Sequence, residues 1–207
     1  CDLLLLHQGV VPNVQISRAL RADHFWDPIG RYWRPVLDST CQSTVSGIAF
    51  AGDGAGIGGA LAAAYQGEIA AFGALARLGA DATVAVAKLL RTARAAHSRH
   101  LAVRPWLEAL FAPAPEFLTP PDEVMVCRCE EVTAGTVRDL ARAGCLGPNQ
   151  LKAVSRAGMG ACQGRYCGST VCELLAEVHE TTPGEVGYYR LRNPVKPVTV
   201  ADLANID

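Results

Sequence analysis

The chain has 207 residues, of which 50% are hydrophobic and 19% are charged, and its formal net charge is -1. This composition describes a globular protein of one large or two small domains. The balanced charge offers no field that would gather nucleic acid or anionic lipid. No apolar run reaches the roughly 18 residues of a membrane span, since the alanine-rich stretch after Gly59 carries Gln66, Glu68 and Arg77. We therefore expect no nucleic-acid partner and no transmembrane segment.

The first hundred residues combine short hydrophobic runs with alanine-rich stretches, a pattern typical of an α/β fold. Four consecutive leucines followed by Gly9 and Pro12 predict a buried strand that ends in a turn. Because the sequence starts at Cys1 and not at a methionine, we expect the amino end to have been cut from something longer. The expected elements are strands over residues 3–6 and 45–51 and helices over residues 58–78 and 81–101, with Gly79 as the stop between the helices.

A proline-rich stretch follows this half of the chain. Five prolines in 17 residues, from Pro105 to Pro121, do not support an uninterrupted helix. We expect an α/β domain over residues 1–103, a linker over 104–122, a small mainly helical domain over 123–180 and an extended tail over 181–207. Prolines in the tail predict an edge or surface segment. The helices expected in the small domain run from the cap at Thr133 to Ala143 with Gly144 as the stop, over residues 148–156, and from a capping box formed by Thr170 and Glu173.

Cysteines supply the strongest chemical signal. Six of the eight lie between Cys127 and Cys172, and such a cluster in a chain without a secretory signal indicates metal or redox chemistry in a reducing compartment. Cys127 and Cys129 lie in a segment predicted to be extended, so both side chains share one face. Cys162 and Cys167 lie in a glycine-rich loop whose backbone amides can approach sulfur closely. The pattern predicts a four-cysteine metal site.

Zinc and iron both accept four thiolates. Structural zinc sites usually use cysteine pairs separated by two to four residues, which a C-x-C pair does not match, whereas four cysteines around two irons is the other standard arrangement. The spacing C-x-C, 32 residues, C-x4-C resembles the bacterioferritin-associated-ferredoxin-like [2Fe-2S] domain over residues 123–178. The resemblance implies a [2Fe-2S] cluster with Cys127, Cys129, Cys162 and Cys167 as its ligands. A zinc-stapled interaction domain is the alternative.

Two arginines, Arg128 and Arg165, lie inside the two ligand pairs. Their charge would favour the more negative reduced cluster and raise its potential, unless they are merely solvated loop residues. The other cysteines are interpreted as packing residues: Cys1, Cys41, Cys145 and Cys172.

A second candidate site follows residues 45–51, where a buried strand is expected to end in Gly52-Asp53 and to turn directly into a helix. This arrangement places a carboxylate and free helix amides at the edge where open α/β sheets bind ligands. Residues 54–59, GAGIGG, also satisfy the dinucleotide pattern G-x-G-x-x-G, but the acidic residue expected about twenty positions later would be Asp81, which precedes an apolar stretch instead of following it.

The segment from Thr44 to Asp53 resembles the late T-x(n)-G-I-x-A-x-G-D motif of two-dinucleotide-binding flavoproteins of the glutathione-reductase type, and the residues around Gly9 and Pro12 resemble the point where their chain leaves the nicotinamide domain. The resemblance implies the carboxyl-terminal part of that fold, with FAD, and with NAD(P) as an option. The family's two G-x-G-x-x-G motifs for FAD and NAD(P)H are absent, so upstream sequence or another chain would supply them. The expected flavin-binding residues are Gly52, Asp53, Gly54 and Gly56.

The order of flavin half-site, linker, [2Fe-2S] module and tail resembles the large flavin subunit of bacterial amine-oxidising complexes, the hydrogen cyanide synthase and opine oxidase type. The resemblance implies an FAD-dependent subunit that oxidises an amino acid or secondary amine while the cluster relays electrons to other subunits or an acceptor. No residue is identified as the catalytic base. A non-catalytic iron-sulfur docking module is the alternative function. We expect a cytoplasmic protein, with peripheral attachment to the inner membrane through partners as an option.

Overall fold

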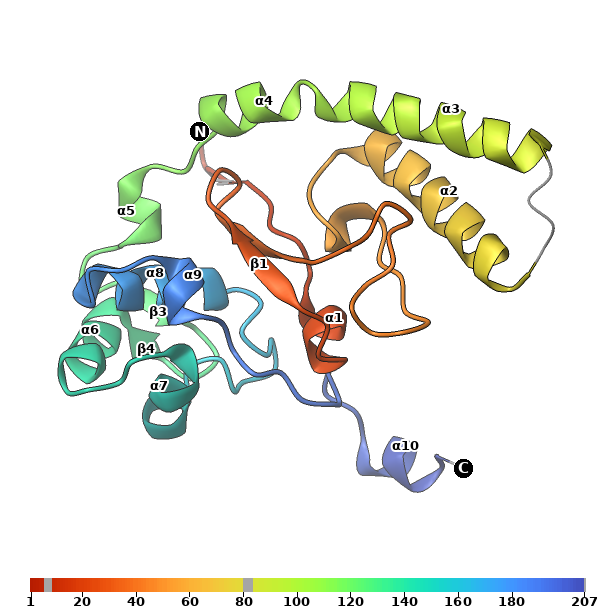
Figure 1. Ribbon diagram of the computed structural model, residues 1–207. Coiled ribbons are helices and arrows are strands. Elements are labelled where there is room, and N and C mark those ends of the chain that lie inside the picture. The colour runs from red at the N-terminus through yellow and green to blue at the C-terminus, as the bar shows by residue number, and fades with distance from the viewer. Residues whose placement is uncertain (6–8, 80–83, 207) are drawn as a thin grey trace. The chain divides into compact units, whose positions relative to one another are not determined.

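The computed structural model describes residues 1–5, 9–79 and 84–206. The chain divides into two compact units, residues 1–112 and residues 113–207, and the boundary falls inside the predicted linker. Both units contain helices together with a short antiparallel strand pair, as Figure 1 shows. No helix in the described ranges is both long enough and apolar enough to cross a membrane.

A β-hairpin and a pair of long helices organise the first unit. Strand β1 (His24–Asp27) pairs antiparallel with β2 (Tyr32–Pro35), and Trp26 stands opposite Trp33. The Asp27 carboxylate closes the turn by accepting hydrogen bonds from the amides of Ile29 and Gly30 at 3.1 and 3.0 Å. The other elements of this unit are α1 (Gln15–Ala19), the 3-10 helix η1 (Gly52–Gly54), α2 (Ala60–Arg77), α3 (Val84–Leu101) and α4 (Arg104–Leu110).

Helices α2 and α3 lie side by side (Figure 1) and confirm the two predicted helices, although residues 80–83 lie outside the described residues. Small side chains allow other segments to approach α2 closely. A Cβ atom at Gly73 would lie 2.6 Å from the Thr40 Cβ, so the Thr40 loop packs directly on the helix backbone. A small core of Cys41, Ile69 and Ala93 forms beneath this contact.

The two strands predicted in this unit are wrong where the structure describes them. Leu3, Leu4 and Leu5 are exposed and outside any strand, and Leu6 lies outside the described residues. Residues 45–51 form a turn around Gly47, whose φ of +79° lies in the left-handed region, and keep only an isolated bridge between Gln42 and Ala49. The hydrophobic pattern predicted buried strands there. In the structure, a turn lets the backbone groups of residues 45–51 form hydrogen bonds with residues nearby in the sequence instead.

Three helices enclose the core of the second unit. Its elements are α5 (Pro115–Leu118), β3 (Met125–Cys127), β4 (Val132–Thr133), α6 (Ala134–Arg142), α7 (Pro148–Ser155), α8 (Gly168–Val178), α9 (Pro183–Val186) and α10 (Val200–Ala204). Strand β3 pairs antiparallel with β4. The fully buried side chains at the centre of α6, α7 and α8 include Val137, Leu151, Val171, Leu174 and Leu175.

The helix ends of this unit follow the sequence signals in most places. The Thr133 hydroxyl accepts a hydrogen bond from the Thr136 amide at 3.2 Å, and Gly144 follows the helix with φ +111°, as predicted. The predicted capping box at Thr170 and Glu173 is wrong. Helix α8 begins three residues earlier because the Cys167 carbonyl already accepts the Val171 amide at 2.8 Å.

Arg138 links the start of this unit to the helices through hydrogen bonds and ion pairs. Its guanidinium donates to the Pro120 carbonyl at 2.9 Å, to Asp122 at 2.5 Å and to Glu177 at 2.8 Å. The Arg138 side chain is only 11% exposed, whereas its partners Asp122 and Glu177 are 65% and 40% exposed, so these bonds lie at the surface end of a buried guanidinium. They hold the segment that leads into β3 against α6 and α8.

The tail differs from the extended surface segment that the sequence predicts. It contains α9 and α10, and Tyr189 is 2% exposed and belongs to the main core of the unit. The Tyr189 ring lies against the backbone of Gly158 and Gly164, where Cβ atoms would come within 2.7 and 3.0 Å of ring carbons. Both glycines have positive φ, +83° and +76°. The tail therefore completes the core behind the glycine-rich loop.

Replacing Gly158 by Ala should lower the free energy of unfolding by about 2–4 kcal/mol, because the methyl group meets the Tyr189 ring and the left-handed backbone is strained. Gly144→Ala is the matched control, since its φ is also positive but no atom lies within 4 Å of the new Cβ. Urea denaturation of the metal-free chain measures the free energy of unfolding of both variants. Equal losses in the two variants would contradict the packing of Tyr189 described above.

Stability of the first unit should fall as pH drops from about 6.5 to about 4. Burial and then the nearby Arg18 lower the pKa of His24 from 6.5 to about 4, and the hydrogen bond from its ring to the Ala22 carbonyl opposes this shift only in part. The unfolded chain therefore binds the proton first, and the stability present above pH 6.5 is lost on acidification. Thermal unfolding of wild type and His24→Gln across this range tests the effect, and parallel curves would refute it.

Candidate functional site

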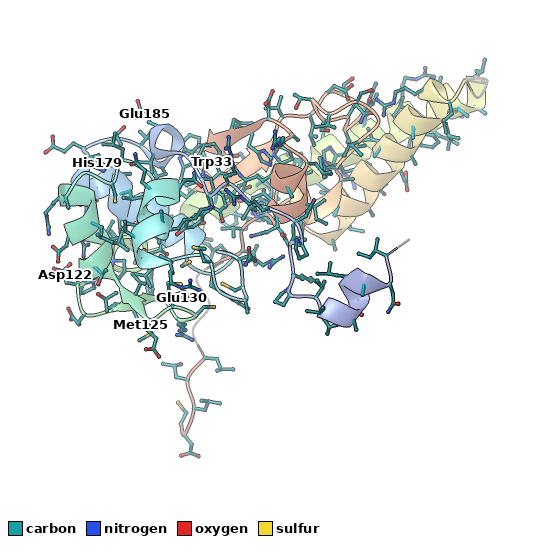
Figure 2. The ribbon with its side chains drawn as sticks, turned by 90° about the horizontal axis from the view of Figure 1, so that it is seen from below. Trp33, Asp122, Met125, Glu130, His179 and Glu185 are labelled. Atoms are coloured by element: carbon teal, nitrogen blue, oxygen red, sulfur yellow. The ribbon has the colours of Figure 1, made fainter. Side chains whose placement is uncertain are left out.

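The four predicted ligand cysteines come from two separate segments of the second unit. Cys127 is the last residue of β3, just after a register shift between Met125 and Cys127, and Cys129 follows two residues later. Met125 and Glu130, labelled in Figure 2, bracket this segment. Cys162 and Cys167 lie in a run of turns that leads directly into α8.

The structure brings the sulfurs together across the two segments. The side chains of Cys129 and Cys162 are joined by a hydrogen bond, and those of Cys127 and Cys167 by another. Electrostatic interaction also links Cys167 with Cys162. Each pair thus takes one cysteine from the β3 segment and one from the loop before α8.

Backbone amides surround the sulfur of Cys162. Partial burial alone would raise the pKa of this thiol, but hydrogen bonds from the amides of Tyr166, Gly164 and Arg165 and from Cys129 lower it below its ordinary value. Amide donors stabilise a thiolate in the same way when it binds a metal. The turn-rich loop therefore favours the thiolate form of Cys162, the form that binds metals.

The two cysteine pairs differ in exposure. Cys127 and Cys167 are each 1% exposed, whereas Cys129 is exposed and Cys162 is partly so. Burial, followed by the neighbouring Cys127 and Cys162, raises the pKa of Cys167 well above its ordinary value. A cavity of about 660 Å³ opens over all four sulfurs, and its other walls are mostly apolar, with Phe117, Pro120, Pro121, Val124 and Tyr166 among them.

This donor set fits two irons better than one zinc ion. Within the described ranges, no three His, Cys, Asp or Glu side chains stand close enough to hold a single metal ion. A structural zinc site needs four ligands around one ion, whereas each iron of a four-cysteine [2Fe-2S] cluster takes two sulfurs. The four cysteines of the two cross-segment pairs, Cys127–Cys167 and Cys129–Cys162, would hold such a cluster.

Arg165 has a structural role that the sequence did not indicate. Its guanidinium donates to the Cys162 carbonyl at 3.0 Å and to the Val195 carbonyl in the tail at 2.8 Å. Arg128 is exposed at the cavity. The hypothesis that the two arginines raise the reduction potential of a cluster stays a prediction. Arg165 in addition bonds the tail to the ligand loop.

The remaining cysteines lie away from the cavity. The Cys172 sulfur donates to the Gly187 carbonyl at 3.1 Å, Cys145 packs at the margin of the core and Cys41 is buried in the first unit. These three are packing residues, as predicted. Cys1 is exposed, so the same expectation is wrong for it.

The predicted flavin-binding residues lie in the first unit, at η1 and the start of α2. Gly52 and Gly56 have φ of +72° and +147°, and Asp53 is exposed. The segment before them is a turn and not a strand, so both the flavoprotein motif and the alternative G-x-G-x-x-G pattern lack the strand they require. Asp81 lies outside the described residues. The structure does contain a glycine-rich turn before helix α2. The first turn of this helix contains no acidic residue.

Two residues that the sequence analysis missed shape this turn. Gln66, a polar residue on the apolar helix α2, accepts a hydrogen bond from the Gly52 amide at 2.9 Å. The Arg34 guanidinium lies so close to Gly56 that a Cβ there would be 3.2 Å away. Arg34, Gly56, Gln66 and His97 line a small cavity of about 50 Å³. Gln66 was detectable as a polar residue on a stretch that is otherwise rich in alanine.

The fold and the paired cysteines define an α/β unit joined to a small four-cysteine iron-sulfur module. Residues 125–177 match the family described as a BFD-like [2Fe-2S] binding domain, which confirms the resemblance predicted for residues 123–178. This match supports a [2Fe-2S] cluster as the cofactor of the second unit.

Nearly the whole chain is similar to particular oxidase subunits. It is 45% identical to an opine oxidase subunit of Rhizobium meliloti (strain 1021) across 97% of this chain and 43% of that protein, and 30% identical to hydrogen cyanide synthase subunit HcnB of Pseudomonas aeruginosa across 98% of this chain and 43% of that protein. The predicted resemblance to this type of subunit is confirmed. The chain spans less than half the length of these curated relatives.

A solved structure supports the α/β fold class. The crystal structure of L-proline dehydrogenase from P. horikoshii superposes with a TM-score of 0.71 over 95% of this chain and 38% of that chain, at 21% identity. Similarity at this level concerns the fold. It confirms the predicted class, a flavoprotein-type α/β region followed by a small helical module.

Gly160→Ala should reduce cluster loading severalfold while leaving the metal-free chain folded. A Cβ at Gly160 would overlap the Cys129 Cβ and lie 3.2 Å from its sulfur, and its backbone is outside the left-handed region, so displacement of Cys129 is the main effect. Iron and sulfide analysis after anaerobic reconstitution measures the loss. Ala161→Ser, at the exposed neighbouring residue, should load normally. Full loading of both variants would exclude Cys129 as a ligand.

Proposed function

We propose that this chain is part of an FAD-dependent oxidoreductase subunit that oxidises an amino acid or a secondary amine, and that a [2Fe-2S] cluster in its second unit relays the electrons. The observation that carries the proposal is the pairing of Cys127 with Cys167 and of Cys129 with Cys162 in a chain similar to an opine oxidase subunit. The four cysteines would hold the two irons.

The residues of the second unit support electron relay. When bound, the cluster supplies one-electron transfer, which complements the two-electron chemistry of a flavin. The amides around Cys162 stabilise negative charge on its sulfur, and the buried pair excludes water from one side of the site. The apolar cavity over the exposed pair leaves room for a redox partner to approach.

The first unit supports the flavin part of the proposal. The Gly52–Gly56 turn, the exposed Asp53 and the amino end of α2 would bind electron-rich oxygens of FAD. The Arg34 guanidinium, which also pairs with Asp27 at 3.4 Å, lies beside Gly56 and would contribute a hydrogen-bond donor at the same place. The amine or amino-acid substrate is inferred from the names of the relatives, opine oxidase and L-proline dehydrogenase.

The chain would work with other subunits of an amine-oxidising complex, because the relatives are named as subunits. Upstream sequence or one of these subunits would complete the flavin site, and the other subunits or an acceptor would take the electrons, with NAD(P) as an optional further cofactor. The complex would be cytoplasmic, with peripheral attachment to the inner membrane through partners as an option.

The full-length subunit, purified anaerobically with its partner chains, should contain two irons and two sulfides per chain and stoichiometric FAD, and an amine substrate should bleach the flavin and then the cluster bands. Cys129→Ser should keep flavin bleaching and abolish the cluster signal. Iron and sulfide without any flavin would favour the non-catalytic docking module. Zinc in place of iron would reject the proposed function.

A further inference from the structure

The guanidinium of Arg165 connects the ligand loop with the tail of the same unit. One nitrogen, Nη1, donates to the Cys162 carbonyl at 3.0 Å, and the other, Nη2, donates to the Val195 carbonyl at 2.8 Å. The backbone amide of Arg165 donates to the same Cys162 carbonyl at 3.2 Å. A carbonyl oxygen has two lone pairs, so one residue engages both. Arg165 thereby sets the orientation of the peptide group that follows Cys162.

The loop around Cys162 requires such a restraint, because it is rich in glycine, which loses more conformational freedom on folding than any other residue. Gln163, directly after Cys162, has φ +52°, in the left-handed region that a non-glycine residue keeps only where its surroundings hold it. The Gln163 side-chain amide donates to the Met159 and Gly160 carbonyls at 3.2 and 3.1 Å, on the amino side of the ligand. On the carboxyl side, Arg165 supplies the corresponding hydrogen bonds.

The end of the tail depends on the same arginine. Among the described residues, the bond from Arg165 to Val195 is the one hydrogen bond that joins residues 192–206 to the rest of the second unit. The other hydrogen bonds of this segment lie within it, at α10. A single guanidinium therefore couples a predicted ligand residue on one side to the position of the tail on the other.

We propose that Arg165 is a positioning residue for the ligand Cys162 and that the tail, acting through Arg165, keeps the cluster from being lost at its exposed side. This inference rests on the proposed [2Fe-2S] site. Cys162 is partly exposed, whereas Cys127 and Cys167 are each 1% exposed, so water and chelators reach the outer sulfurs first. A restrained peptide group after Cys162 keeps its sulfur directed at the iron. For this role the planar fork of Arg165 matters more than its charge, because the fork reaches two carbonyls at once.

Arg165→Lys keeps the positive charge but replaces the fork with a single ammonium group. The rate at which the cluster-loaded, full-length subunit loses its visible absorbance to an iron chelator under anaerobic conditions should rise about tenfold, the lower end of the range for residues that orient metal ligands. Arg165→Gln should lose its cluster at the same increased rate. If charge alone matters, Arg165→Lys should behave as wild type, and that result would overturn the proposal.

Two control variants separate positioning from general stability. Arg192→Gln changes an exposed arginine of the tail whose side chain makes no hydrogen bond among the described residues, and it should keep the wild-type rate. Thr182→Ala removes the capping box of α9 and so lowers stability outside the ligand loop. The EPR spectrum of the reduced cluster should change in Arg165→Lys and stay as in wild type in both controls. Rapid cluster loss in Thr182→Ala as well would contradict a specific role for Arg165.

A shortened chain tests the coupling between tail and loop. Ending the chain at Leu191 removes the Val195 carbonyl and leaves Arg165 in place. Cluster loss should accelerate as in Arg165→Lys, and combining the two changes should add little, because both break the same link. If the two effects multiply in the combined variant, the tail and the arginine act independently and the coupling is refuted.

Hydrogen exchange of the metal-free, full-length subunit gives a measurement that needs no cluster. In Arg165→Lys the amides of residues 163–166 should exchange with deuterium faster than in wild type, while those of α6 and α8 keep their protection. Unchanged exchange, in a protein whose wild type binds iron and sulfide, would reject the positioning role alone. If wild type contains no iron and sulfide, the proposed function fails, and the role of Arg165 falls with it.

Discussion

The burial of Cys127 and Cys167 in one apolar core is the constraint on which the site depends. The two residues come from segments forty positions apart, and each is 1% exposed among Val137, Leu151 and Leu174. Packing of α6, α7 and α8 therefore brings the two ligand segments together. The hydrophobic effect contributes to the free energy that aligns them.

The same constraint makes the site asymmetric. Because Cys127 and Cys167 are fixed inside the core, Cys129 and Cys162 are left at its margin, where the apolar cavity opens. All four cysteines line this cavity, and the outer pair is the more exposed to an approaching redox group. The inner pair shares the core of the unit with Tyr189.

Local and spacing signals in the sequence predicted much of the second unit. The Thr133 cap, the Gly144 stop and the C-x-C and C-x4-C spacing each depend on a few neighbouring residues, and the helices and sulfur pairs appear where they indicate. Tyr189 could not be predicted in this way. Its burial depends on two glycines some thirty residues earlier in the chain, and the prolines around it are typical of a surface tail.

The first unit shows why hydrophobic runs are weaker evidence for strands than local and spacing signals are for helices and ligand pairs. Residues 3–6 and 45–51 look like buried strands, but neither described part pairs in a sheet, because hydrophobicity does not specify a partner strand. The hairpin from His24 to Pro35 was missed, although the Asp27 turn between aromatic residues is a recognisable signal. The flavin half-site could therefore be located only approximately, and Arg34 and Gln66 emerged from the structure.

The tail joins these observations into one physical argument. Tyr189 packs behind the loop of Cys162 and Cys167, and Arg165 of that loop bonds the Val195 carbonyl farther along the tail. The loop is thus held from both its packed face and its exposed edge. A glycine-rich loop alone would lose a large conformational entropy on presenting two sulfurs in fixed positions. Contacts with the tail restrict those glycines in the folded chain, which accounts for a buried aromatic residue in an otherwise irregular, proline-containing segment.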